Sequence, residues 1–202
     1  DVRALLADPR LSALPTRPGF PILSEGRAQI VHQQVDSFIR LDGEEHARIR
    51  KMFTAEFTVK RISDLRERTI ALTNSLIDRM LAGSKPVDFV KAFSLKLPSN
   101  LMGQILGVPE EDEEFFQDCG TRMIDLSLSA AENMEAAEEF RLYICRLVDS
   151  KRANPGADDL ITRLIRERLD TGALTYDETV ATIQLLIIAG HETTAHTLSL
   201  ST

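Results

Sequence analysis

The densest apolar stretch of the sequence lies in residues 175–202, TYDETVATIQLLIIAGHETTAHTLSLST. Thr175 is followed three residues later by Glu178, a capping-box pattern in which each side chain bonds a backbone N–H at a helix start. A long helix is therefore predicted to begin there. Its apolar residues cover nearly the whole circumference, which is typical of a helix buried on most sides. They are Val180, Ile183, Leu185, Leu186, Ile187, Ile188 and Ala189.

The upstream sequence predicts further helices joined by loops, and hence a mainly α fold with little β. Pro86–Val90 has the pattern of a short extended segment, and residues 13–41, which contain Pro15, Pro18 and Pro21, predict a long irregular connection. Apolar residues at helical spacing mark the other elements. The predicted helices are Val2–Ala7, Gly43–Phe53, Thr58–Gly83, Ala92–Leu106, one that begins in Glu110–Glu114, one between Ser129–Glu132 and Val148, and one from Asp158 through Arg168.

The predicted helix Thr58–Gly83 is long and amphipathic, with Gly83 in the stop position. We interpret it as scaffold. The residues expected on its inner side are Val59, Ile62, Leu65, Leu72, Leu76, Ile77 and Met80.

Polar residues interrupt the apolar helix at Ala189-Gly190-His191-Glu192-Thr193-Thr194. A helical glycine costs about 1 kcal/mol relative to alanine, and a buried carboxylate costs several kcal/mol unless it is paired or hydrated. The Thr193 hydroxyl can bond the Ala189 carbonyl four residues back and bend the helix. Two interpretations are open: a notch with an acid and an alcohol beside it, or a glycine that lets another helix approach while Glu192 faces water.

The segment His191-Glu192 followed by His196 also invites a zinc interpretation. In the zinc-protease pattern the two histidines are four residues apart and share one helix face. Here they are five apart, which turns the second imidazole about 140° away at 3.6 residues per turn. The spacing therefore argues against a zinc site.

His46 and Arg50 lie at i and i+4 in the predicted helix Gly43–Phe53 and so share one face. An imidazole N–H beside a guanidinium makes a receptor for a carboxylate, which arginine can bind through two parallel bonds. The alternative is an ordinary solvated helix face.

Composition and charge narrow the class of protein. With 202 residues, 43% hydrophobic and 27% charged, the chain has enough apolar material for a globular core, and a net charge of −7 argues against nucleic acid as the general partner. No apolar run reaches about 20 residues and no signal segment is recognisable, so a cytoplasmic protein without a membrane span is expected. Cys119 and Cys145 lack paired or metal-binding spacing and are interpreted as reduced packing residues.

Several of these segments resemble one family. An apolar helix carrying A-G-x-E-T-T resembles the oxygen-activating central helix of the bacterial cytochrome P450 family, which are haem-thiolate monooxygenases. The H-x-x-x-R pair His46/Arg50, the phrase LADPRLS at Leu6–Ser12 and the phrase LPSNLMGQILGVP at Leu97–Pro109 resemble the same family. The chain departs from it at Gly43-Glu44, where family members often have two prolines.

The resemblance implies a fold, a cofactor and roles for particular residues. The fold would be the amino-terminal helical part of a cytochrome P450, with haem b beneath the central helix. Dioxygen would bind at Ala189 and Gly190, Thr193 would donate a hydrogen bond to it, and Glu192 would bring protons from solvent. His46 and Arg50 would hold a haem propionate. Leu185, Ile188 and Ala189 would face a small organic substrate.

The resemblance also implies partners. Electrons would come from a ferredoxin and a ferredoxin reductase. Arg48, Lys51 and Arg61 make one region locally basic and suit docking of an acidic ferredoxin, although a solvated basic face explains them equally well.

Only about the first half of the family pattern is present. Neither cysteine has the glycine-rich context of the haem ligand, and the later E-x-x-R pair is absent. Residues 1–202 are therefore expected to be part of a single domain, truncated at both ends relative to the family fold and inactive alone. Two alternatives stay open: a nitric oxide reductase of the same fold, suggested by Thr16–Pro21, and a non-catalytic helical binding domain.

Overall fold

The computed structural model of the chain describes residues 1–6, 8, 10–21, 37–125 and 127–202. Within these ranges every regular element is helical, which confirms the predicted fold class. In chain order the elements are α1 (Val2–Leu6), η1 (Phe38–Arg40), α3 (Gly43–Phe53), α4 (Val59–Ala82), η2 (Val90–Ser94), α5 (Lys96–Leu106), η3 (Glu110–Asp112), α6 (Glu113–Ile124), α7 (Ala130–Ala153), α8 (Leu160–Leu164), η4 (Ile165–Leu169) and α9 (Tyr176–Leu200).

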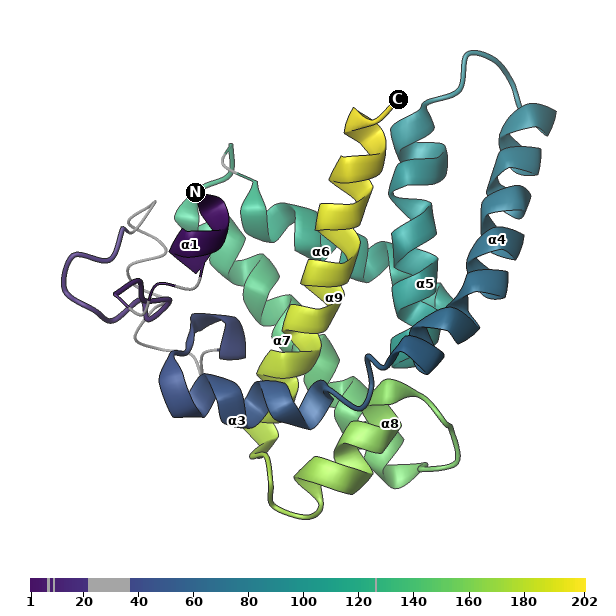
Figure 1. The fold of residues 1–202 in the computed structure, drawn as a ribbon. Helices are drawn as coiled ribbons and strands as arrows, with labels where there is room; N and C mark the ends of the chain where they lie inside the picture. The colour runs from purple at the N-terminus through teal and green to yellow at the C-terminus, as the bar shows by residue number, and fades with distance from the viewer. Residues whose placement is uncertain (7, 9, 22–36, 126) are drawn as a thin grey trace.

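The long helix α9 organises the molecule. It runs through the middle of the view in Figure 1, with α5 and α4 on one side and α6 and α7 on the other. It contacts α5, α7 and the two π-helical turns η2 and η4. Ile183 and Ile187 on α9 are buried, whereas Ala189 and Thr193 are exposed. The prediction of a largely enclosed helix is therefore confirmed for its first half, and one face of its second half is open.

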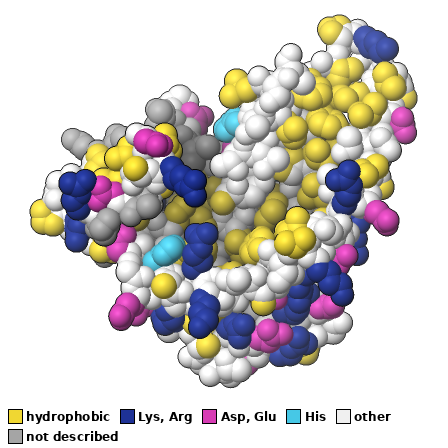
Figure 2. All heavy atoms as spheres, viewed as in Figure 1, with side chains coloured by type: hydrophobic (Ala, Val, Ile, Leu, Met, Phe, Trp, Pro, Cys, Tyr) yellow, Lys and Arg dark blue, Asp and Glu magenta, His cyan; other side chains and the backbone are white. Residues whose placement is uncertain are grey.

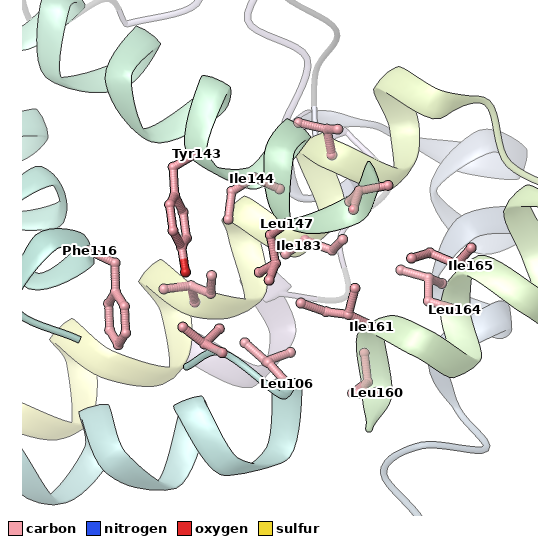
Figure 3. Packing of buried hydrophobic residues seen from close by; sticks show 14 of the residues in the cluster. Leu106, Phe116, Tyr143, Ile144, Leu147, Leu160, Ile161, Leu164, Ile165 and Ile183 are labelled. Atoms are coloured by element: carbon pink, nitrogen blue, oxygen red, sulfur yellow. The ribbon is translucent and has the colours of Figure 1, made fainter. Parts of the chain in front are cut away.

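The main core forms where α6, α7, α8 and α9 converge (Figure 3). Phe116, Ile144, Ile161 and Ile183 contribute side chains that are almost completely removed from water. Burial of such side chains is the main source of stability in a helical protein of this size. This core fixes the first half of α9, and with it the position of the residues that follow.

Local sequence signals set the helix starts as predicted. Thr175 accepts a hydrogen bond from the Glu178 N–H (3.1 Å), and the Glu178 carboxylate accepts one from the Thr175 N–H (2.8 Å). Asp42 lies directly before α3, but its carboxylate accepts hydrogen bonds from the Ser12 hydroxyl and the Ala13 N–H (2.9 Å) instead of from the helix. The same residue therefore ties the amino-terminal segment to the start of α3.

The extended segment predicted at Pro86–Val90 is wrong, because helical structure begins at Phe89 and continues into η2. Asp88 explains the early start, since its carboxylate accepts a hydrogen bond from the Lys91 N–H (3.1 Å) in the first turn. Pro98 has no N–H to give to the carbonyl four residues back. The preceding segment Val90–Ser94 winds as a π turn, which the Leu95 N–H closes by donating a hydrogen bond to the Val90 carbonyl (3.0 Å).

The inner side predicted for the long helix α4 is only partly correct. Leu76 is buried, but Val59 and Ile62 are exposed, at 84% and 49%. The reason is that α4 packs mainly against α5 and η2, so most of its surface has no helix over it. Figure 2 shows hydrophobic side chains gathered over the part of the surface where α4 and α5 lie.

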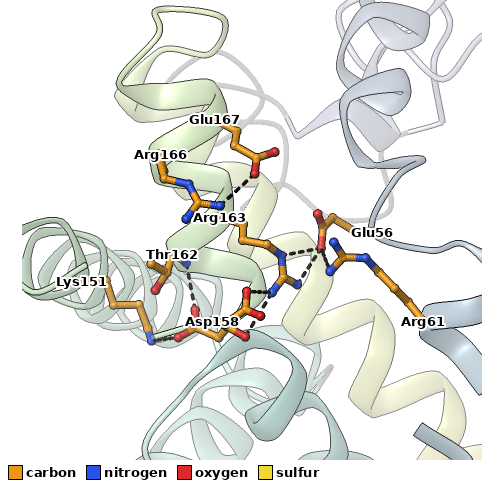
Figure 4. Close-up of polar contacts among 9 residues, drawn as sticks. Glu56, Arg61, Lys151, Asp158, Thr162, Arg163, Arg166 and Glu167 are labelled. Atoms are coloured by element: carbon orange, nitrogen blue, oxygen red, sulfur yellow. Dashed lines mark hydrogen bonds and ion pairs between the residues drawn. The ribbon is translucent and has the colours of Figure 1, made fainter. Parts of the chain in front are cut away.

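A polar cluster joins the start of α8 to its neighbours (Figure 4). Arg163 bonds Glu56 (2.7 Å) and Asp158 (2.7 Å), and Lys151 bonds Asp159 (2.6 Å). Asp159 also caps α8 by accepting a hydrogen bond from the Thr162 N–H (2.8 Å). These bonds hold the α3–α4 connection and the end of α7 against α8.

Candidate functional site

Glu192 and Thr193 are consecutive on α9 but face different surroundings. The Glu192 side chain is buried, with 8% of the residue exposed, and Thr193 is exposed. The Thr193 hydroxyl donates a hydrogen bond of 2.6 Å to the Ala189 carbonyl, as the spacing predicts. The interpretation in which Glu192 faces water is therefore wrong. A buried acid and an accessible alcohol adjoin each other on one turn.

His191 is the nearest ionisable partner of the buried carboxylate. Its Nδ1 lies 3.5 Å from Glu192 Oε1, and His196 Nε2 lies 3.8 Å from Oε2. The contact with His191 lowers the pKa of Glu192, and although burial opposes this, the net pKa stays below its usual value. The two imidazoles differ in environment, since His191 is 2% exposed and the His196 side chain is 65% exposed. They do not share a face, as their spacing predicts.

Gly190 lies against α5. A Cβ built on it would meet the Met102 Sδ at 2.4 Å, so no larger residue fits while Met102 keeps its place. The glycine therefore serves the close approach of α5, as one of the two interpretations of this residue has it. Its contribution to a dioxygen groove stays a prediction.

The exposed face of α9 carries the other predicted residues. Ala189 and Thr193 are one helical turn apart and both exposed, while Leu185 and Ile188 are half-buried. Figure 2 shows that the surface of this side of the molecule is hollowed. A small side chain and a hydroxyl on an open face allow a flat ligand to approach the helix closely.

His46 and Arg50 share one face of α3 as predicted. His46 is half-buried and its ring lies 6.2 Å from that of Phe38, which itself stacks on Phe53 at 5.9 Å. Arg50 is exposed. Within the described ranges neither side chain forms a hydrogen bond or ion pair, so both retain donors for an anionic ligand.

Two of the three basic residues predicted for ferredoxin docking form ion pairs within the chain. Arg48 forms ion pairs with Glu45 (3.0 Å) and with Glu178, and Arg61 pairs with Glu56 (3.1 Å). The Glu178 pair joins α3 to the first turn of α9. It therefore sets the position of the His46 and Arg50 face relative to the helix that carries Glu192.

Sequence reasoning missed the residues that other helices bring to His191 and Gly190. Leu95 and Phe116 contact His191, Met102 lies against Gly190, and Gly120 faces the adjacent Glu192. These four residues lie 72 to 96 residues upstream of their partners. A helical pattern reveals which residues share a face but not which distant face packs against it. Nothing in the sequence identified them.

The part of the chain that the structure describes contains no group of three or more His, Cys, Asp or Glu side chains placed to hold a metal ion. Of the helices described, none has the length and apolar character needed to span a bilayer.

Comparison with known sequences identifies relatives of the chain. No protein-family model matches it. The chain is 42% identical over 204 residues to cytochrome P450-SU2 of Streptomyces griseolus, covering 100% of the chain and 49% of that protein. It is 39% identical over 199 residues to the vitamin D3 dihydroxylase of the same organism, covering 98% and 48%. The chain thus spans about half the length of the curated relatives it matches.

Solved structures share the fold. The mycinamicin VIII C21 methyl hydroxylase MycCI from Micromonospora griseorubida superposes with a TM-score of 0.84 at 36% identity, covering 98% of this chain and 49% of that one. The thaxtomin-hydroxylating cytochrome P450 TxtC gives a TM-score of 0.87 at 31% identity, covering 99% and 51%. By sequence and by fold, the chain belongs to the bacterial cytochrome P450 family and corresponds to its amino-terminal half.

Proposed function

We propose that this chain supplies the oxygen-activating part of a haem-dependent monooxygenase, which inserts one oxygen atom of O2 into a small organic substrate. The observation that carries the proposal is the pairing of an exposed hydroxyl, Thr193, with a buried carboxylate, Glu192, on one turn of α9. Residues 1–202 would form part of a single domain whose other half supplies the haem-ligating cysteine.

Haem b fits the residues on α3 and α9. The unpaired donors of His46 and Arg50 suit a propionate carboxylate, because charge-assisted bonds from a guanidinium are strong and directional. Ala189 is small and exposed, which lets a flat macrocycle lie close to the α9 backbone. Gly190, whose missing Cβ faces Met102, would contribute to this site through its backbone.

Thr193 and Glu192 of α9 would deliver protons to the bound oxygen. When bound, haem supplies the electron transfer that activates O2. The Thr193 hydroxyl, which donates to the Ala189 carbonyl, keeps its lone pairs free to accept a hydrogen bond from water and can rotate to donate toward the ligand side. Glu192 lies one residue away and would pass protons inward from solvent, a role suited to a carboxylate whose charge is held by a neighbouring imidazole.

Substrate and redox partners follow from the same assignment. Leu185, Ile188 and Ala189 would face the substrate and favour an apolar organic molecule. Electrons would come from a ferredoxin and its reductase. Since Arg48 and Arg61 are paired within the chain, Lys51 is the residue of the basic region most available for docking.

The decisive experiment is the optical spectrum of the full-length protein after reduction and addition of carbon monoxide. A haem-thiolate protein gives a strongly red-shifted Soret band under these conditions. Consumption of reducing equivalents with incorporation of ¹⁸O from labelled O2 into product then distinguishes a monooxygenase from a nitric oxide reductase. A purified, folded full-length protein that binds no haem would contradict the proposal and favour a non-catalytic binding domain.

A further inference from the structure

We propose that His191 is a positioning residue for Glu192: anchored on the Leu95 carbonyl, it acts as the counter-charge that keeps the Glu192 carboxylate turned inward between α9 and α6. The proposal rests on the monooxygenase function above. It gives a role to a residue that the acid–alcohol pair alone does not use.

The anchor is provided by the irregular start of α5. His191 Nε2 lies 3.3 Å from the Leu95 carbonyl oxygen, and Nε2 is therefore the nitrogen that carries a proton. Leu95 follows the π turn η2, and among the described residues its carbonyl accepts one backbone hydrogen bond, a long one of 3.4 Å from the Ser99 N–H. π turns frequently occur at functional sites because they free backbone groups from the regular pattern. Here the weakly bonded carbonyl receives the imidazole.

Packing fixes the ring in this orientation. The His191 side chain is 3% exposed, and the Phe116 ring of α6 meets it edge-on, with 6.3 Å between ring centroids. With Nε2 directed at Leu95, the opposite nitrogen Nδ1 is the one left to face Glu192. The orientation of the imidazole is thus determined by α5 and α6, not by α9 itself.

The carboxylate depends on this imidazole for compensation. Glu192 Oε1 is buried and, among the described residues, accepts no hydrogen bond of normal geometry. Its neighbours are His191 Nδ1 at 3.5 Å and the α6 backbone, where a Cβ built on Gly120 would lie 3.7 Å from it. A buried carboxylate with an oxygen so poorly satisfied is stable as an anion only when a positive charge lies close by. A protonated His191 supplies that charge.

The other titratable groups around His191 and Glu192 do not replace His191 as the counter-charge. From α6, Glu113 and Cys119 are acids and cannot carry a positive charge. Burial raises the pKa of both, that of Cys119 to about 11. On α5, the positive charge of Lys96 acts on the Glu113 carboxylate, whose pKa it lowers. On α9 itself, His196 approaches the other oxygen, Oε2, but its side chain is 65% exposed to solvent screening. His191 is the buried imidazole closest to the Glu192 carboxylate, and the counter-charge is therefore assigned to it.

In the proposed proton delivery, Glu192 alternates between its ionised and its protonated form. A counter-charge that keeps the acid ionised and inward lets it collect a proton from the exposed His196 side and release it toward Thr193. Removing that charge would leave the acid protonated over more of the pH range. The pH dependence of Glu192 ionisation therefore tests the role directly, without measuring turnover.

The experiment is an infrared pH titration of the Glu192 carboxyl stretch in the full-length haem protein, assigned by subtraction of the E192Q spectrum. The test variant is H191Q, because a glutamine amide can still donate to the Leu95 carbonyl but cannot take up a proton. We expect the midpoint of the Glu192 titration to move to higher pH in H191Q. H191N, which loses the Leu95 bond and the charge together, provides a second neutral variant and should shift the midpoint in the same direction.

H196Q is the matched control, since it removes an imidazole at similar distance that is exposed. Its Glu192 midpoint should move less than that of H191Q. An unchanged midpoint in H191Q and H191N, or an equal shift in H196Q, would overturn the proposal. The carbon monoxide spectrum decides the proposed function separately, because it depends on haem ligation and not on the ionisation of Glu192.

Discussion

Arg48 of α3 forms an ion pair with Glu178 in the first turn of α9 and donates a hydrogen bond of 3.1 Å to the Ala173 carbonyl just before that helix. Glu178 serves twice, because its carboxylate also completes the capping box with Thr175. Burial raises the Glu178 pKa, but the Thr175 N–H and Arg48 outweigh it and hold the pKa below its usual value. The helix carrying His46 and Arg50 is thereby tied to the start of α9.

Replacement of Arg48 should loosen this connection. We expect R48Q to lower the free energy of unfolding by about 1 kcal/mol, since the pair is partly exposed and the glutamine keeps some hydrogen bonding. Haem should dissociate faster from the variant, because the two helices that would hold it are less firmly related. The matched control is R141Q, whose ion pair with Glu138 lies within α7. Equal effects of R48Q and R141Q on haem release would contradict this role of Arg48.

Gly107 makes a second long-range contact that tolerates no side chain. Its φ is +78°, in the left-handed region, and a Cβ there would meet Asp159 Cγ at 2.2 Å. G107A should therefore displace Asp159 from Lys151 and from the first turn of α8, and lower the free energy of unfolding by roughly 2–4 kcal/mol. Urea unfolding measures the effect.

Gly156 provides the control for Gly107. A Cβ built on it has nothing within 4 Å and its φ is not in the left-handed region. G156A should leave the free energy of unfolding within about 0.5 kcal/mol of the native value. If the two variants were equally stable, the packing of Gly107 against Asp159 would have no energetic importance.

The sequence predicts those parts of the molecule that depend on near neighbours. The capping box at Thr175 and Glu178, and the Thr193 bond to Ala189, each join residues three or four apart, so spacing alone reveals them. The same holds for the shared face of His46 and Arg50. These local features, together with the motif they form, were enough to indicate the family.

The remaining features depend on contacts between distant segments. The Leu95 carbonyl contacts His191, which lies 96 residues later in the chain. Met102 occupies the space beside Gly190, which lies 88 residues later. The exposed Val59 shows the converse, since an apolar residue at helical spacing is buried only where another element covers it. A pattern of apolar residues defines a face, whereas the identity of its partner is decided by the packing of the whole chain.

The contact between Gly190 and Met102 predicts a coupled pair of substitutions. G190A places a Cβ at 2.4 Å from Met102 Sδ, and overpacking of this kind costs about 1–3 kcal/mol, against about 1 kcal/mol gained in helix propensity. We expect a net loss of stability in G190A. In the M102A background the same change should stabilise the protein, because the obstructing thioether is gone. Additive effects in this double-mutant cycle, measured by urea unfolding, would contradict a direct contact.

The exposed hydroxyl of Thr193 predicts an effect on chemistry without an effect on folding. Its hydrogen bond to the Ala189 carbonyl lies at an exposed position of α9, where loss of a hydroxyl changes stability by about 0.5 kcal/mol or less. If Thr193 passes protons from Glu192, T193A should consume electrons as fast as the native enzyme while product per electron pair falls by on the order of tenfold. The missing electrons should appear as hydrogen peroxide.

Two further variants serve as controls for T193A. T193S keeps the hydroxyl and should retain most of the coupling. T194A alters the exposed residue beside it and should leave coupling close to native. Native coupling in T193A would show that the hydroxyl is not on the proton route, and that Glu192 delivers protons by another path.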